Sequence, residues 1–303
     1  MIMKTIRQLN ELETTPEALE RTRAYLCGQM QRILHPNETV LICFADEGPV
    51  SLGGLLKQVL LDCKCKPVFW GPDRRWKGLL RQAFESYASA VIGLPLVVLG
   101  LMKISKATQT PLNIHNAFLL GYPYTSWMTE GIKRGLDCRT WGCYWIGEGP
   151  VIAGFTCDKE VGIHIRADIF EAKVCRADGS IEEDARRGTL TLHYKPEPGL
   201  VFDTQETAKI WHQPCSCGCD DPRIVETQYV GGRDPARTML EDRFLSWSSV
   251  LDYRVSEGSE GLSVELVVFP GETVPEITGC ADVQIRPWDP NTDVPFCLRS
   301  FTK

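Results

Sequence analysis

The sequence has no excess of positive charge: 39 acidic residues outnumber 33 basic ones, for a net charge of −6 over 303 residues. Proteins that bind nucleic acid usually concentrate basic residues on one face, so this composition argues against a nucleic-acid partner. Long apolar runs are also missing, because the longest, residues 91–102, is shorter than the roughly 20 residues of a membrane span. The sequence therefore predicts neither a nucleic-acid-binding nor a membrane-spanning protein.

The first residues do not resemble a signal peptide, since residues 1–7 lack an apolar core. Low-complexity tracts and internal repeats are missing too. The composition is that of an ordinary globular protein, with 43% hydrophobic and 24% charged residues, and the length is typical of two domains or of one large and one small domain. These features predict a cytoplasmic globular protein.

Residues 40–145 alternate short apolar runs with longer helical patterns. Five runs are candidate strands: residues 40–44, 67–70, 90–92, 117–120 and 139–141. Four stretches between them space apolar residues as amphipathic helices do: residues 52–61, 76–87, 94–104 and 126–136. Because a parallel crossover needs a dozen or more residues, this alternation predicts a mostly parallel sheet with flanking helices and with ligands at the carboxyl ends of its strands.

The pattern changes after Gly149 to short alternating runs separated by Asp-Gly and Pro-Gly turns, which predict an antiparallel β subdomain over residues 150–230. Residues 231–303 are predicted to form a small, truncated C-terminal α+β subdomain. It should contain one helix near residues 238–247, a hairpin of residues 251–255 and 262–269, and an irregular, proline-rich tail from Pro270. The predicted fold class is α/β, followed by these two smaller parts.

Cysteine is abundant, with thirteen residues, but the number is odd and the spacing is not that of a small disulfide scaffold. The densest cluster is Cys215, Cys217 and Cys219, and clustered thiols in a reducing compartment indicate a metal. Tetrahedral zinc needs two further ligands, for which Cys157 and His164 are the natural candidates. Cys219 is an alternative to either Cys215 or Cys217, and buried thiols that pack as small hydrophobes are the alternative to any metal.

The other cysteines are not expected to bind metal. Cys63 and Cys65 lie where a helix is followed by a strand, which favours a place in the core. Seven more are isolated in the sequence and are expected to be core or surface thiols: Cys27, Cys43, Cys138, Cys143, Cys175, Cys280 and Cys297.

Five motifs follow one another in the second half of the chain: Tyr144–Glu148, Cys157, Gly162–Asp168, Phe202–Glu206 and Cys215–Gly218. In order and spacing they resemble the phenylacetate–coenzyme A ligase branch of the adenylate-forming enzymes. That branch carries Tyr-Gly-x-Thr-Glu, a cysteine, Gly-x-His, Arg-Tyr-Arg-Thr-x-Asp and Cys-Pro-Cys-Gly. Upstream, Leu120–Pro123 stands where the family has Gly-Gly-Glu-Pro beside the adenine. The resemblance spans about residues 40–255.

The resemblance implies an acid–coenzyme A ligase, in which a small carboxylic acid and ATP form an acyl-adenylate that coenzyme A then attacks. Residues 1–149 would form the nucleotide-binding-like subdomain, and the Cys-His cluster would hold a structural zinc. Glu148 would be the catalytic, magnesium-binding residue, and Glu206 would hold the ribose of AMP or ATP. Gly121 and Tyr122 would border the adenine, with Tyr144 nearby. Each of these residues has an ordinary alternative as a packed aromatic, turn or surface residue.

The sequence departs from this family at the groups that meet phosphate. It has no Ser/Thr/Gly-rich phosphate loop: residues 11–16 are the only candidate remnant, and the chain is expected to begin where that loop ends. Trp145 and Gly147 stand where the family has Gly and Thr, and Asp203 stands in place of an arginine. No Ser-Gly-Lys-like segment supplies the C-terminal lysine that completes adenylation in the family.

These departures predict a ligase-like protein with weak or lost standalone activity. One alternative is a non-catalytic, zinc-stabilised binding or regulatory subunit derived from the family. The other is the downstream piece of a split ligase, whose phosphate loop a protein partner would supply. The acid substrate is left open, because pocket residues come from scattered loops.

Overall fold

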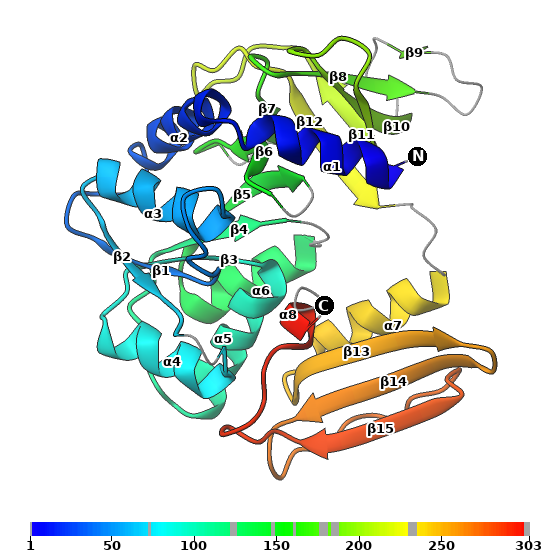
Figure 1. Cartoon of the computed structure of the whole chain (residues 1–303). Coiled ribbons are helices and arrows are strands. Elements are labelled where there is room, and N and C mark those ends of the chain that lie inside the picture. The colour runs from blue at the N-terminus through cyan, green and yellow to red at the C-terminus, as the bar shows by residue number, and fades with distance from the viewer. Residues whose placement is uncertain are drawn as a thin grey trace.

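The structure is a computed structural model that describes residues 2–71, 74–121, 126–146, 149–159, 162–175, 181–182, 188–229 and 235–299. In these residues one large sheet runs through most of the molecule, and a small sheet packs below it with the C-terminal elements (Figure 1). The described residues include no helix long and apolar enough to cross a membrane.

The parallel half of the large sheet has the predicted alternation of strands and helices. Its strands pair in the order β2-β1-β3-β4-β5, all parallel: β1 Thr39–Ile42, β2 Lys66–Phe69, β3 Ala90–Gly93, β4 Asn116–Leu120 and β5 Arg139–Ile146. The helices between them are α3 Leu52–Asp62, α4 Trp76–Glu85, α5 Pro95–Ala107 and α6 Ser126–Leu136. The α/β class and its mostly parallel sheet are confirmed.

Both faces of this parallel half are buried, and the strands distribute their side chains between two cores. Leu41 and Val91 face the core built with α4, α5 and α6. Their neighbours Val40 and Ile92 face the core built with α3 and with α2, Pro16–Met30. Successive side chains on a strand point to opposite faces, so a strand covered on both sides reads as a continuous apolar run. This explains why the short apolar runs predicted these strands.

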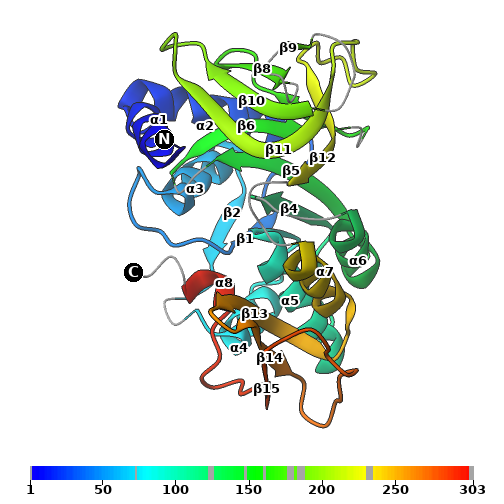
Figure 2. The ribbon, with the colours of Figure 1, turned by 90° about the vertical axis from the view of Figure 1, so that its right-hand side faces the viewer.

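The sheet continues without a break into antiparallel strands. The order after β5 is β6-β7-β12-β11-β10-β8-β9, and the strands are β6 Val151–Thr156, β7 Ile163–Ile165, β8 Phe170–Cys175, β9 Ile181–Glu182, β10 Gly188–Tyr194, β11 Val201–Trp211 and β12 Arg223–Tyr229. Figure 2 shows β10, β11 and β12 curving above the parallel strands. The antiparallel part is confirmed, whereas the predicted border after residue 149 falls inside continuous strand pairing and stays a prediction.

The N-terminal segment forms two helices, α1 Ile2–Glu13 and α2, and its junction corrects one expectation. Residues 11–16, the candidate remnant of a phosphate loop, contain the end of α1 and the cap of α2. Thr15 Oγ1 accepts a hydrogen bond from the Ala18 amide at 3.3 Å, and Pro16 is the first helical residue. This is the capped start of a helix, in which the Thr15 side chain accepts the hydrogen bond of the Ala18 amide. The segment is therefore not a loop whose backbone amides could bind phosphate.

The C-terminal part consists of α7 Pro235–Ser246, the hairpin β13 Val250–Gly258 and β14 Gly261–Val268, β15 Asp282–Pro287 and α8 Phe296–Arg299. The helix and the hairpin are confirmed, but the prediction of an irregular tail was wrong. β15 pairs in parallel with β14, from Ser263 opposite Asp282 to Val268 opposite Pro287. Its only alternation is that of Val283 and Ile285 in a proline-rich stretch, and most of its side chains are exposed, so its strand signal is weak.

A buried lysine joins this C-terminal part to the large sheet's helices. Lys103, on α5, donates hydrogen bonds from Nζ to the carbonyl of Trp247 at 3.0 Å and to that of Val250 at 2.7 Å. Burial lowers the pKa of Lys103 to about 8, against the opposing effect of Asp252. Leu251 belongs to the same core as α4, α5 and α6. The C-terminal part therefore packs on the α/β part through both apolar and polar contacts.

Candidate metal centre and nucleotide-like site

Strand pairing brings together the four residues predicted to hold zinc. Cys157 directly follows β6, and His164 lies in β7, which pairs with both β6 and β12. Cys215 and Cys217 lie in the turn between β11 and β12. One side-chain ligand atom from each residue lies within 4.8 Å of the other three. Two antiparallel connections, far apart in the sequence, thus meet at one point.

The distances within this cluster fit a tetrahedral zinc. Sγ of Cys157 lies 3.7 Å from Sγ of Cys215, and Sγ of Cys217 lies 3.5 Å from Nε2 of His164. Zinc bonds of about 2.3 Å to sulfur and about 2.0 Å to nitrogen, at a tetrahedral angle, place ligand atoms roughly 3.8 Å and roughly 3.5 Å apart. These two distances therefore match those that a single tetrahedral zinc would need.

The remaining contacts orient the ligands. Nδ1 of His164 lies 3.1 Å from the carbonyl oxygen of Asp221, which favours a proton on Nδ1 and leaves the lone pair of Nε2 directed at the thiols. The Gly218 amide donates to the carbonyl of Cys215 at 2.9 Å, and Gly218 has φ of +83°, a conformation that glycine adopts readily. Cys219 is outside the group of converging ligand atoms, so the described structure does not favour it as a ligand.

A pocket of about 190 Å³ borders the cluster on the side of α2. Its walls come from the end of α2 and the residues after it, from β5, from the end of β6 and the residues after it, and from the turn between β11 and β12: Gln29, Arg32, Ile33, Trp141, Thr156, Cys157, Asp158 and Cys217. Two predicted metal ligands line it, so small solutes such as a chelator can approach the cluster from this side.

Tyr144 and Glu206, both predicted to lie near a nucleotide, contact each other. Tyr144 is on β5 and Glu206 on β11, and the hydroxyl of Tyr144 hydrogen bonds to the Glu206 carboxyl. Glu206 is 3% exposed, and its Oε2 has no hydrogen-bond partner among the described residues. Burial raises the pKa of Glu206 to about 7, although the hydrogen bond from Tyr144 opposes the rise. A ribose could reach this carboxyl only after it becomes exposed.

Replacing Glu206 with glutamine is expected to stabilise the protein at pH 8. The folded state holds the carboxyl proton more tightly than the unfolded state, so wild-type stability falls as the pH rises from about 4.5 to about 7 and the loss is complete above that range. Glutamine stays neutral and can still accept from Tyr144. At pH 8 the variant should gain about 2 to 3 kcal/mol in the free energy of unfolding, measured with urea.

The matched control is Glu226→Gln on the neighbouring strand β12, whose carboxylate is half exposed and pairs with Lys209. This variant should change stability by less than about 1 kcal/mol at either pH. Equal effects of Glu206→Gln at pH 5 and pH 8 would mean that Glu206 is ionised in the folded protein over this range.

The flank of Gly121, predicted to border adenine, is filled by Trp145. A Cβ atom on Gly121 would lie 2.9 Å from Cε3 of the Trp145 ring. The same ring meets Phe44 edge-on, with centroids 5.8 Å apart, and its Nε1 donates to the carbonyl of Gly149 at 2.5 Å. The indole is thus fixed on two sides at the carboxyl ends of β1, β4 and β5.

Other predicted site residues fall outside this geometry. Glu148 and Tyr122 lie outside the described residues. Asp203 is exposed on β11, and its carboxylate accepts a hydrogen bond from the amide of Gln205 at 2.9 Å. Its negative charge is therefore available to solvent.

A buried polar network attaches α1 and α2 to the sheet, and no motif in the sequence indicates it. Arg166 is fully buried and donates to Thr22 at 3.0 Å, to the carbonyl of Ile152 at 3.2 Å and to Asp168 at 2.8 Å. Its guanidinium also lies over the ring of Tyr25, 4.5 Å from the centroid. The hydrophobic periodicity of a helix predicts only which apolar residues are buried, so it does not predict that the polar Thr22 is buried.

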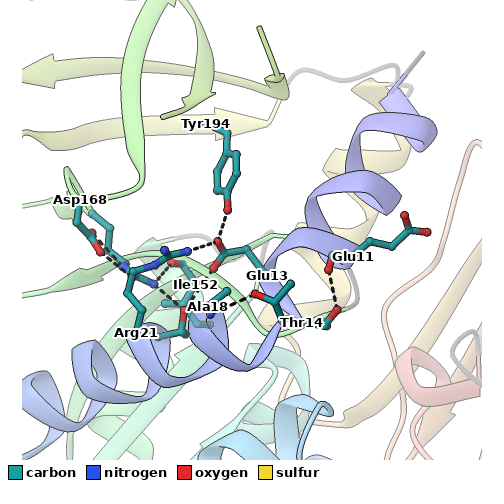
Figure 3. A network of polar contacts seen from close by, with 11 residues as sticks. Glu11, Glu13, Thr14, Ala18, Arg21, Ile152, Asp168 and Tyr194 are labelled. Atoms are coloured by element: carbon teal, nitrogen blue, oxygen red, sulfur yellow. Dashed lines mark hydrogen bonds and ion pairs between the residues drawn. The ribbon is translucent and has the colours of Figure 1, made fainter. Parts of the chain in front are cut away.

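Glu13, at the end of α1, is a second buried charge of this network (Figure 3). Its carboxylate accepts from Arg21 at 2.8 Å and from the hydroxyl of Tyr194 at 2.6 Å. Helix α1 is thereby attached to both α2 and β10.

No family model matches the sequence, and no curated protein does. Solved structures do match. A 2-hydroxyisobutyryl-CoA ligase in an open conformation with 2-HIB-AMP and CoA has a TM-score of 0.59 at 13% identity, over 82% of this chain and 60% of that one. The amide bond synthetase McbA from Marinactinospora thermotolerans has a TM-score of 0.55 at 12% identity, over 93% and 66%. A benzoate CoA ligase from Burkholderia xenovorans LB400 has a TM-score of 0.55 at 10% identity, over 92% and 65%.

This chain therefore spans less than two thirds of the length of these three proteins. At such low identity the likeness concerns the path of the backbone alone. The chain has the fold of the adenylate-forming acyl-CoA and amide-bond ligases.

Proposed function

We propose that this chain is an acid–coenzyme A ligase-like protein of the adenylate-forming type, similar in its motifs to the phenylacetate–coenzyme A ligase branch, with weak adenylation activity on its own. The observation that carries this proposal is the Trp145 ring beside Gly121, on a fold otherwise shared with such ligases. The ring takes up space that the resemblance assigns to adenine. The fold supports the ancestry, and the ring supports the weakened activity.

The ligand class follows from the fold and from the residues that it brings together. Two structures of the 2-hydroxyisobutyryl-CoA ligase hold 2-HIB-AMP with CoA and R3-HIB-AMP, respectively, which supports a small carboxylic acid, AMP or ATP with magnesium, and CoA as the ligands. Glu148 is proposed to hold the magnesium, and Gly121 and Tyr122 to border the adenine. Tyr144 and Glu206 are proposed to meet the nucleoside, with Glu206 on the ribose.

The described side chains fit a nucleotide poorly. Glu206 is buried against Tyr144, and the indole of Trp145 covers the flank of Gly121. These two observations favour a second candidate function, a non-catalytic binding or regulatory subunit that keeps the ligase scaffold. None of these contacts supports a protein partner that supplies a phosphate loop.

A structural zinc is part of both candidates. Cys157, His164, Cys215 and Cys217 would supply four protein ligands and leave no open position for water or substrate. The metal would join the connection between β6 and β7 to the turn between β11 and β12. Its proposed role is therefore to stabilise the antiparallel strands.

Nucleotide binding tests the proposal. We expect calorimetry to show that AMP binds wild-type protein more tightly than ATP with magnesium, because Asp203 places negative charge where the family has an arginine. Replacing Trp145 with alanine should strengthen AMP binding at least tenfold, because it clears the flank of Gly121. The AMP affinity of the milder variant Trp145→Leu should lie between those of wild type and Trp145→Ala. This variant provides the test if loss of the whole ring impairs folding.

Trp211→Ala removes an indole from the far end of β11 and should leave AMP binding unchanged. Tighter binding of ATP with magnesium than of AMP would contradict the role given to Asp203. Equal AMP affinity in wild type and in both Trp145 variants would show that the ring does not limit access. No heat with AMP, ATP or CoA in any variant would favour the non-catalytic candidate.

A further inference from the structure

A pair of thiols lies between α2 and α3, away from the metal cluster. Cys27 belongs to α2, and Cys63 is the residue at which α3 ends. Their Sγ atoms are 3.6 Å apart, and the Cys63 thiol also lies 3.8 Å from the carbonyl of Cys27. The two residues are separated by 36 positions in the sequence, so only the packing of the two helices brings them together.

An ion pair holds the two helices in this arrangement. Arg23, one turn before Cys27 on α2, donates from Nη2 to Oδ1 of Asp62 at 2.6 Å and from Nε to Oδ2 at 2.5 Å. Asp62 immediately precedes Cys63. A bidentate arginine–carboxylate contact fixes both distance and orientation, so it keeps the two thiols facing each other.

The third thiol of this region is directed elsewhere. Sγ of Cys65 lies 3.5 Å from the carbonyl of His35 and 3.7 Å from that of Cys63. Cys63 is 5% exposed, whereas Cys27 is half-buried and can be reached by a small reagent. The accessible and the enclosed thiol thus form a pair in which one can react first and the other can follow.

We propose that Cys27 and Cys63 are a modification site at which a peroxide forms an intramolecular disulfide between α2 and α3. The Cys27 sulfur attacks one oxygen of hydrogen peroxide, the O–O bond breaks, and one water leaves with the sulfenic acid formed. The Cys63 sulfur then attacks the Cys27 sulfur, the S–O bond breaks, and a second water leaves with the proton of Cys63. Two thiols are oxidised by two electrons, and one peroxide is reduced to two waters.

The geometry suits this order. The sulfurs must approach from 3.6 Å to about 2.05 Å, a movement that side-chain torsions can supply while the helices stay in place. Burial, together with the neighbouring Cys27, raises the pKa of Cys63 to about 12, so Cys63 remains a thiol until Cys27 has reacted. Disulfides in reducing compartments are usually transient and redox-sensing, which fits a reversible cross-link here.

The cross-link should stabilise the folded chain. It closes a loop between positions 36 residues apart and so restricts the unfolded state, which we expect to raise Tm by about 5 °C. The gain should disappear on reduction with dithiothreitol. Helix α2 also carries Thr22 and Tyr25 of the Arg166 network, so the effect reaches the contact between the N-terminal helices and the sheet.

The test uses the intact, zinc-loaded chain treated with a small molar excess of hydrogen peroxide. Peptide mapping by mass spectrometry without reductant should find the Cys27 and Cys63 peptides joined, with the loss of two hydrogens. Cys27→Ser should abolish both the joined peptide and the rise in Tm. Cys63→Ala removes the second partner without adding a polar group to a buried position, and it should also abolish both effects. Cys138→Ser changes a half-buried thiol on the far side of the sheet and should keep both effects.

Two results would overturn the proposal, and a third would contradict the stabilisation expected from it. One is Cys27 recovered only as a sulfinic acid, which would show that Cys63 does not reach it. Another is Cys27 joined to a different cysteine. The third is a Cys27–Cys63 disulfide whose Tm equals that of the reduced protein, since the link would then fail to constrain α2 and α3.

Discussion

Protein purified without chelator is expected to contain one zinc per chain, and Cys217→Ser is expected to lose it together with at least about 10 °C of Tm. The thiolate is one of four converging ligands, and three ligands hold zinc much more weakly than four. Binding of a structural zinc is coupled to folding, so its loss removes several kcal/mol of stability at once. Metal analysis and thermal unfolding measure the two effects together.

Cys219→Ser is the matched control, because it changes a thiol of the same turn that lies outside the converging group. This variant should keep its zinc and its Tm. Zinc lost equally from both variants would instead make Cys219 a ligand in place of one of the other thiols. Zinc far below one equivalent in wild type, with unchanged stability in Cys217→Ser, would leave the cluster as packed thiols.

Replacing Arg166 with methionine is expected to lower the free energy of unfolding by about 3 to 5 kcal/mol, the range found when one partner of a buried charge network is removed. Arg166 is fully buried, and its loss leaves the hydroxyl of Thr22 and the carbonyl of Ile152 without this donor. It also removes the guanidinium from the ring of Tyr25. Urea unfolding at pH 7 measures the difference.

The exposed ion pair of Lys209 with Glu226 provides the comparison. Lys209→Met removes a charge at a contact of similar length, 2.7 Å, but should cost less than about 1 kcal/mol because water screens the pair. Thr22→Val combined with Arg166→Met should cost less than the sum of the single changes, since the two residues share one hydrogen bond. Additive effects would show that Arg166 acts through packing alone.

The parallel half of the fold could be predicted from the sequence because its signals are local. A strand covered on both faces must be apolar throughout, and a helix that covers it must place apolar residues every three or four positions. Residues such as Val40 to Ile42 carry this requirement in consecutive positions. The edge strand β15 has no such requirement, because most of its side chains are exposed. It shows only the short alternation of Val283 and Ile285, and it is held by backbone pairing with β14.

The cysteine and histidine cluster was also visible in the sequence, since zinc chemistry restricts both the residue types and their spacing. The sequence could group Cys215 and Cys217 because they are neighbours. Cys157 and His164 were the natural further candidates, and the motif order agreed with them. What the sequence could not supply is the pairing of β7 with both β6 and β12, which places the four ligand atoms within 4.8 Å of one another.

The tertiary structure alone decided which residues are buried together. Glu206 reads in the sequence as a ligand-binding or surface carboxylate, yet it is enclosed against Tyr144. Cys27 reads as an isolated thiol, yet it faces Cys63 across two helices. Local sequence reports the periodicity of an element and hence its buried face, whereas contacts between distant elements depend on how those faces pack. The sequence therefore determined the parallel strands, the helices between them and the candidate metal-ligand set, whereas packing decided which charges are buried, the thiol pair and the space beside Gly121.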